Sequence, residues 1–345
     1  VRPVSPRASR PAGPAELVLA ASLACAGGPA GAAEPTAPPA AASAAEVGVA
    51  DAAQSARAMD NALGALESTR RAVRSATVWL GRTIDSWFGD LPFDDDSAVQ
   101  SGRLSLSLGT RQGEDPDINL RFDARMRLPN VERQGYLFLG RDDPREVVSD
   151  TPDEVSRQSV LAKPAQAADP SFFAGLGVTR HSIDYRLGFR GGLKPYAQAR
   201  YRQSWTPSPA DLVEFRETVF WSVDDRFGST TTLSYTHAFS PTLSARWFNS
   251  ATITQETRAL EWSSILGTYK AFGGQRSLGA ELILSGTEGA AVPVSDYGLQ
   301  LKWEQPAYED WLLVELIVGH FWPRDDALQA RGREWAVGGS LKLLF

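Results

Sequence analysis

Charged side chains recur at alternate positions from residue 121 onward, and they separate by sign along the chain. One group is basic, with Asp123 and Asp184 as its acidic companions. The members of this basic wall are Arg121, Arg125, Arg127, Arg186, Arg190, Arg200 and Arg202. The members of a later acidic wall are Glu261, Glu281, Asp296, Glu304 and Glu315. Charges that line a narrow aqueous path set its selectivity through the local potential. If the two walls face each other across an enclosed space, they predict a path for a small polar solute.

The same charges have a second interpretation, which is a filled interior. Opposed arginine and glutamate side chains can neutralise one another in ion-pair networks. Such networks make an interior polar without making it a pore. The residue types alone do not decide between an open and a filled interior, so both interpretations stay open at this point.

Glu217 departs from the alternation of its segment. It shares the apolar parity, between Phe215 and Val219. A carboxylate that faces lipid at the middle of a membrane is unfavourable. Either a bulge therefore shifts the register of this strand, or Glu217 meets a partner chain or a helix.

Signatures of catalysis and metal binding are weak. The chain has three histidines and one cysteine, Cys25, which is too few for a rich metal site. His181 precedes Ser182, but adjacent residues of a strand point to opposite sides and make a poor catalytic pair. No G-x-S-x-G or H-E-x-x-H motif occurs. The formal charge of −6 gives no basic excess for nucleic acid. We therefore predict no catalytic residues, no metal and no cofactor.

The elements that must position these charges are β-strands. From Arg103 onward apolar and polar residues alternate, which is the period of a strand with one apolar and one polar face. Turn residues interrupt this pattern every ten to fifteen residues. The segments predict an all-β fold over residues 101–345, a transmembrane antiparallel up-and-down β-barrel of fourteen strands. Twelve strands is the alternative, because the segment 172–180 has the weakest pattern.

Tryptophans fall near the ends of the predicted strands. Indole rings prefer the headgroup level of a membrane, so they predict two aromatic girdles. The girdle expected at the periplasmic side holds Trp205, Trp247, Trp303 and Trp311. The girdle expected at the outer side holds Trp221, Trp262, Trp322 and Trp335.

The last predicted strand, Arg333–Phe345, alternates up to an aromatic terminal residue. This terminus resembles that of bacterial outer-membrane β-barrels of the porin-like class. In that class the terminal aromatic strand closes the barrel and is read by the barrel-assembly machinery, so the resemblance implies this role for Phe345. It also implies a place in the outer membrane of a Gram-negative bacterium, in contact with lipid and lipopolysaccharide.

The resemblance leads to three functional hypotheses. The first is a non-enzymatic outer-membrane barrel that acts as a narrow passive diffusion channel. The second is a structural barrel with a filled lumen that recruits a partner. The third, which the motifs favour least, is an outer-membrane enzyme that modifies lipids.

The first hundred residues have a different character. Residues 1–32 combine Arg2, Arg7 and Arg10 with a short apolar stretch and an A-x-A pattern, which predicts a signal peptide and export through the inner membrane. Residues 33–50 are rich in alanine and proline and predict a disordered linker. Apolar residues in 51–90 recur at helical spacing. We expect an amphipathic helix there, packed on the barrel or on a second copy, lying on the membrane, or entering the lumen.

Overall fold

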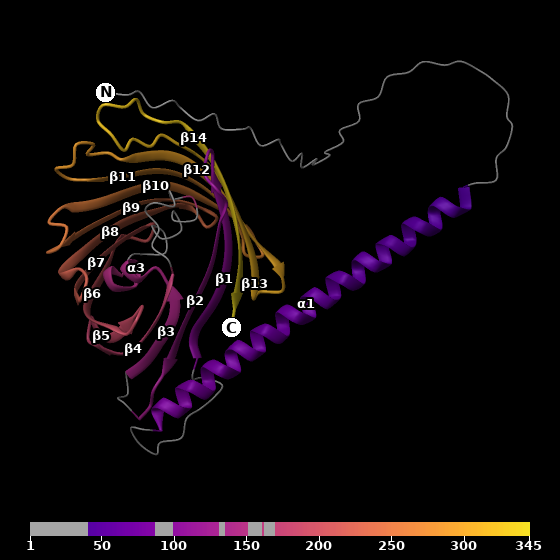
Figure 1. Cartoon of the computed structure of the whole chain (residues 1–345), viewed down its shortest axis with the longest axis horizontal. Coiled ribbons are helices and arrows are strands. Elements are labelled where there is room, and N and C mark those ends of the chain that lie inside the picture. Colours follow the sequence, from indigo (N-terminus) through magenta and orange to yellow (C-terminus); the bar gives the residue numbers. More distant parts are fainter. Residues whose placement is uncertain (1–40, 87–98, 131–134, 151–160, 162–169) are drawn as a thin grey trace, which may run out of the picture. The chain divides into compact units, whose positions relative to one another are not determined.

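A computed structural model describes residues 41–86, 99–130, 135–150, 161 and 170–345, with side chains from residue 57 onward. Within these residues, fourteen antiparallel strands form a closed barrel in which β1 pairs with β14 (Figure 1). The strands are β1 (Val99–Arg111), β2 (Asp117–Arg127), β3 (Gly135–Asp142), β4 (Ser171–Arg180), β5 (Ile183–Arg190), β6 (Lys194–Ser208), β7 (Asp211–Ser222), β8 (Arg226–Ser240), β9 (Leu243–Thr254), β10 (Leu260–Gly273), β11 (Arg276–Thr287), β12 (Asp296–Tyr308), β13 (Leu312–Phe321) and β14 (Glu334–Leu344). The prediction of fourteen strands is confirmed, and the doubtful segment forms β4.

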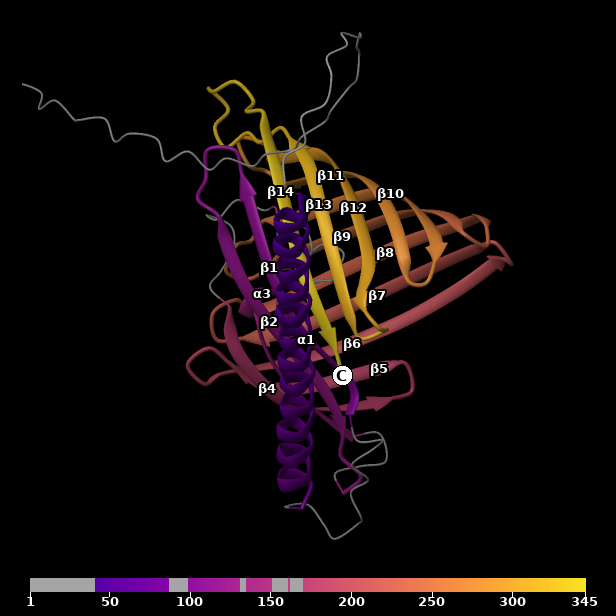
Figure 2. The same ribbon diagram turned by 90° about the vertical axis from the view of Figure 1, so that its right-hand side faces the viewer.

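The barrel has a transmembrane design. Its strands run obliquely around the wall (Figure 2). Closure pairs the backbone of every strand with two neighbours, as a hydrocarbon environment requires. The outward positions carry large apolar side chains, and Ile118 and Leu187 are 71% and 67% exposed. A water-facing surface of this kind would be unfavourable, whereas lipid accommodates it.

Helix α1 (Ala41–Asp85) differs in its bounds from the prediction. It begins at Ala41 rather than at residue 51, so residues 41–50 of the predicted linker are helical. Alanine has the highest helix propensity, and the last proline of this region is Pro39. The signal peptide, residues 33–40 and the expected helix end at 87–90 lie outside the described residues. Within the described part of the chain, no helix carries an apolar stretch that could span a membrane.

Residues 60–85 of α1 pack their apolar stripe on the outer face of the barrel. Leu63 and Leu66 contact the cluster of Trp311, Leu312 and Leu343. Further along the helix, the apolar side chains that contact the outer face of β2 and β3 are Leu80 and Ile84. The stripe therefore lies across the seam where β14 meets β1, as one of the interpretations of the helix proposed.

Two polar contacts hold the same part of α1. Arg70 Nε donates to the carbonyl of Leu344 at 2.9 Å, and its guanidinium lies 5.1 Å from the centre of the Trp311 ring. Asp85, which is 1% exposed, accepts hydrogen bonds from Asn130 N at 2.9 Å and Asn130 Nδ2 at 2.6 Å. The helix is thus joined both to the terminal strand and to the turn after β2.

Asp85→Ala tests this second contact. The substitution removes both hydrogen bonds that Asn130 donates to the buried Asp85 carboxylate, which lowers the free energy of unfolding by about 1–3 kcal/mol. Urea unfolding in lipid vesicles measures the effect. Asp60→Ala is the control, because Asp60 is exposed on the same helix and its loss changes stability by less than about 0.5 kcal/mol. Equal changes in the free energy of unfolding for the two substitutions would show that the Asp85–Asn130 contact does not stabilise the packing of α1 on the barrel.

Candidate functional site

The connection after β3 enters the lumen as a short helix, α3 (Pro144–Ser149), which lies inside the ring of strands (Figure 1). Its start follows from local sequence. The Asp143 carboxylate accepts from Arg145 N at 2.8 Å as the N-cap, and Pro144 occupies the first turn. The helix ends at Asp150, which has a left-handed backbone with φ 56°. Residues 143–150 thus fold inward from the wall of the barrel.

Two apolar side chains anchor the inserted segment to different parts of the wall. Val148 is fully buried in a cluster with Tyr136, Phe138, Tyr196 and Phe220. Leu161 is 1% exposed. It packs on inward side chains of the later strands, namely Phe248, Ile265, Ile283, Ile317, Phe321 and Ala336. Val148 therefore contacts the β3–β7 side of the lumen, and Leu161 contacts the β9–β14 side.

Asp150 is the centre of the basic wall. Its carboxylate lies 2.9 Å from Arg200 Nη1, 3.4 Å from Arg216 Nη1 and 3.9 Å from Arg186 Nη1. A second carboxylate, Asp184, lies 2.9 Å from Arg200 and 3.2 Å from Arg186. The end of α3 thus supplies a negative charge to arginines that project from β5, β6 and β7.

The remaining arginines of the basic wall each contact different groups. Arg190 bridges Pro144 O at 2.7 Å and Asp225 at 3.0 Å. Arg121 lies 3.2 Å from Asp142, and the Arg125 guanidinium lies 3.4 Å from the centre of the Tyr136 ring. Arg127 and Arg202 are exposed. The other five contact partners in or beside the lumen: Arg121, Arg125, Arg186, Arg190 and Arg200.

The acidic wall is paired along its own strands. Glu281 contacts Lys302 at 2.9 Å on the adjacent strand. Lys342 of β14 lies 2.5 Å from Glu304 and 2.8 Å from Glu315.

Asp296 completes this local pairing, because it lies 2.8 Å from Arg111 of β1. Glu261 is exposed near the start of β10. The ion pairs among the described residues therefore neutralise each wall locally rather than join the two walls.

Sequence reasoning missed four charged groups of these networks. Arg111, Arg216 and Lys342 share the inward parity of their strands, so the alternation held the signal that could have found them. Asp150 had no such signal, because it lies in a connection whose path the strand period does not predict.

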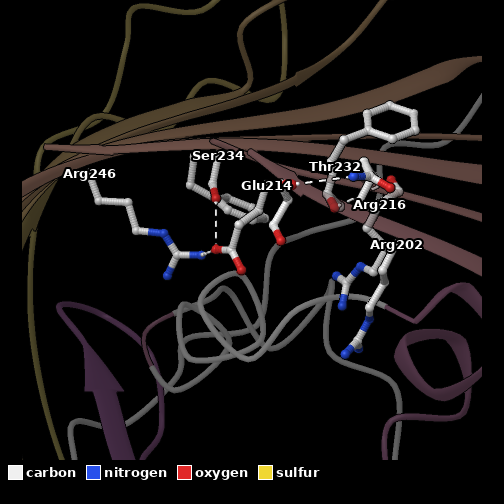
Figure 3. A pocket seen from close by; sticks show the side chains of 10 residues that line it. Arg202, Glu214, Arg216, Thr232, Ser234 and Arg246 are labelled. Carbon is white, nitrogen blue, oxygen red and sulfur yellow. Dashed lines mark hydrogen bonds and ion pairs between the residues drawn. The ribbon is translucent and has the colours of Figure 1, made fainter. Parts of the chain in front are cut away.

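A cavity of about 330 Å³ opens in the lumen beside this network (Figure 3). Arg202 and Arg216 line one side of it, and Arg246 lines the other, 3.8 Å from Glu214. A second cavity of about 190 Å³ shares Arg246 and continues along the acidic wall past Lys302. The two cavities together extend along one side of the lumen, from β6 to β13.

Among the described residues near the first cavity, guanidinium groups outnumber carboxylates. Three carboxylates, Asp150, Asp184 and Glu214, face five guanidinium groups. The five are Arg186, Arg200, Arg202, Arg216 and Arg246. Within the described residues, no hydrogen bond or ion pair holds Arg202. Guanidinium groups match carboxylate and phosphate oxygens, so this arrangement is chemically suited to contact an anion.

The tryptophans of the two predicted girdles lie toward the two ends of the strands. At the end that holds Val99 and Leu344 are Trp205, Trp247, Trp303 and Trp311. At the opposite end are Trp221, Trp262, Trp322 and Trp335. Seven of the eight are partly or well exposed, but Trp311 is 6% exposed beneath Arg70 of α1. Their girdle role stays a prediction.

An Asp–His contact was also missed. His237 Nδ1 lies 2.7 Å from Asp211 Oδ1, because hairpin register pairs these residues across β7 and β8. The Ser208 hydroxyl donates to the other oxygen of Asp211 rather than to the imidazole. This order of contacts does not activate a nucleophile, which needs a base beside it.

No protein-family model and no curated protein matches this sequence. The solved structures with a similar fold include a KdgM porin in complex with disordered oligogalacturonate, at 7% identity, with 70% of this chain and 99% of that chain covered and a TM-score of 0.34. OmpT, an outer membrane protein of Vibrio cholerae, is similar at 10% identity, 74% and 100% coverage and a TM-score of 0.38. The outer membrane channel DcaP of Acinetobacter baumannii is similar at 6% identity, 71% and 96% coverage and a TM-score of 0.42. These likenesses concern the fold alone. The closed barrel and its apolar outer face have the architecture of the outer-membrane β-barrel class.

Proposed function

We propose that this chain forms a narrow passive channel for small anionic solutes in the outer membrane of a Gram-negative bacterium, which it reaches after export through the inner membrane. The observation that carries the proposal is the lumenal cavity lined by Arg202, Arg216 and Arg246. Its excess of guanidinium groups raises the local concentration of anions and lowers that of cations.

Two features favour passage over permanent retention of the solute. Arg216 forms an ion pair with Asp150, and Arg246 forms an ion pair with Glu214. A conducting site must bind strongly enough to admit a solute and weakly enough to release it. Carboxylates that partly neutralise the arginines keep the attraction within that range.

The inserted segment makes the channel narrow. Gln198 Nε2 donates to the carbonyl of Val147 at 2.7 Å, which ties α3 to the wall at β6. Together with the buried side chains of Val148 and Leu161, this contact fills part of the lumen with protein. The same burial supports the second candidate, a structural barrel with a filled lumen.

Conductance in planar bilayers separates the two candidates. Refolded protein that is heat-modifiable on gels is expected to give discrete single-channel steps and a reversal potential that favours chloride over potassium. A folded barrel without conductance would contradict the channel and favour the filled lumen.

Arg202→Gln tests the site itself. Loss of one charge beside the path lowers the ratio of anion to cation permeability by roughly two- to fivefold, since unit charges at 4 Å interact by about 1 kcal/mol even in water. Arg226→Gln is the matched control, because this side chain is 70% exposed in the β7–β8 turn. If both substitutions shift the reversal potential equally, the arginine cavity does not set selectivity.

A further inference from the structure

Glu217 faces outward at the middle of the barrel wall. The register is continuous through it, with Tyr201 opposite on β6 and Thr231 opposite on β8, so no bulge turns it inward. Four residues further along β7 lies Trp221, and four residues back lies Val213, which pairs with Trp205. The carboxylate is therefore halfway between two tryptophans that lie near opposite ends of the strands.

Glu217 belongs to a larger set of outward polar side chains. The hydroxyls of Ser229 and Thr231 donate to its two oxygens, the latter at 2.6 Å. A second network runs from Trp247 Nε1 to Ser264 Oγ at 3.0 Å and from Ser264 Oγ to Asn249 Oδ1 at 2.9 Å. We call this set the outer polar patch; its members are Gln203, Glu217, Ser229, Thr231, Asn249 and Ser264.

The outer polar patch is costly in lipid. Two hydroxyl donors leave lone pairs of the Glu217 carboxylate without a partner, and a charged group at mid-depth of a bilayer is unfavourable. Asn249 also keeps an unused donor, because its Nδ2 makes no hydrogen bond to the described residues. An acceptor and a donor on one face make the patch complementary to a copy of itself.

The shape of the patch indicates a broad occupant. It extends over five strands, from β6 to β10, which is about 19 Å at a strand spacing of about 4.8 Å. A single helix is only about 10 Å wide. Small outward residues, Ala199 and Ala251, flank Glu217 and allow close approach of a second backbone. Residues 60–85 of α1 pack on the clusters around Leu312 and Met126, which belong to β13, β14, β2 and β3, so they do not cover this face.

We propose that the outer polar patch is the interface through which two copies of this chain associate in the membrane. In a two-fold arrangement the same patch lies on both sides, and Glu217 of each copy receives donors such as Asn249 Nδ2 from the other. The inference requires the barrel to lie in a membrane, but it does not depend on whether the lumen conducts.

Cross-linking in lipid nanodiscs tests the location of the interface. In a Cys25→Ser background, Thr231→Cys is expected to give covalent dimers with a short bifunctional thiol reagent. Leu106→Cys is the matched control: it is also outward and 47% exposed, but lies on β1, seven strands away around the ring. Cross-linking at both positions, or only at Leu106→Cys, would overturn the proposal.

The role of the carboxylate is tested by mass measurement of the same nanodisc samples. Glu217→Leu is expected to weaken dimerisation by at least about tenfold while the barrel stays heat-modifiable, and Glu217→Gln, which keeps hydrogen bonding, is expected to weaken it less. A wild-type chain that stays monomeric at every protein-to-lipid ratio overturns the proposal. Recovery of a different membrane protein bound at Thr231→Cys would overturn the choice of a second copy as the occupant.

Discussion

Asp150→Asn is expected to raise the anion selectivity of the lumen by a factor of about five, because one fixed negative charge near the path is worth about 1 kcal/mol or more to a passing anion. Asp150 is the shared partner of Arg186, Arg200 and Arg216. Without its charge these guanidinium groups repel one another more strongly, although Asp184 remains beside Arg186 and Arg200. The end of α3 then loses its electrostatic attachment to the wall, so single-channel conductance is expected to rise as well.

The choice of asparagine separates charge from backbone strain. Asp150 has φ 56°, a left-handed conformation that asparagine tolerates and alanine does not. Asp150→Ala should therefore combine the charge effect with about 1 kcal/mol of strain, whereas Asp150→Asn reports on charge alone. Glu256→Gln is the control, since Glu256 is 63% exposed in the β9–β10 turn. An unchanged reversal potential in Asp150→Asn would exclude the arginine network from the conduction path.

Some lumenal residues could be predicted from the sequence and others could not, and the difference has a physical reason. Side chains of a strand alternate strictly between two faces, so the register of the sheet placed Arg200 and Glu315 in the lumen once the strands were found. Turn residues then limited the strand count to fourteen or twelve. Asp150 and Leu161 lie in a connection, where no period links sequence to position.

The filled-interior interpretation expected opposed arginine and glutamate side chains to pair across the lumen. Adjacent strands are about 4.8 Å apart, far closer than opposite walls. Short contacts such as that of Lys302 with Glu281 therefore form between neighbouring strands of one wall. The start of α1 was misplaced because alanine-rich sequence is compatible both with a linker and with a helix.

Lys342→Met is expected to lower the free energy of unfolding by about 3–5 kcal/mol, the range for removing one partner of a buried ion pair. Lys342 is the ammonium group between Glu304 and Glu315, and the Glu315 side chain is 2% exposed. Methionine fills a similar volume but leaves a buried carboxylate without its cation. Lys342 lies on β14, which closes the barrel by pairing with β1. The substitution is therefore expected to destabilise the pairing of these two strands.

A second substitution shows whether the lower free energy of unfolding comes from the buried charge of Glu315. In Lys342→Met/Glu315→Gln the buried position is neutral, and Ser340 Oγ can still donate to the amide oxygen that replaces its 3.3 Å carboxylate contact. Urea unfolding in lipid vesicles is therefore expected to recover at least half of the lost stability. The pair Arg71–Glu67 on α1 provides the contrast, because both side chains are well exposed and Arg71→Ala should change stability by less than about 0.5 kcal/mol. If the double variant is no more stable than Lys342→Met, packing of the lysine side chain rather than its charge stabilises the closing strand.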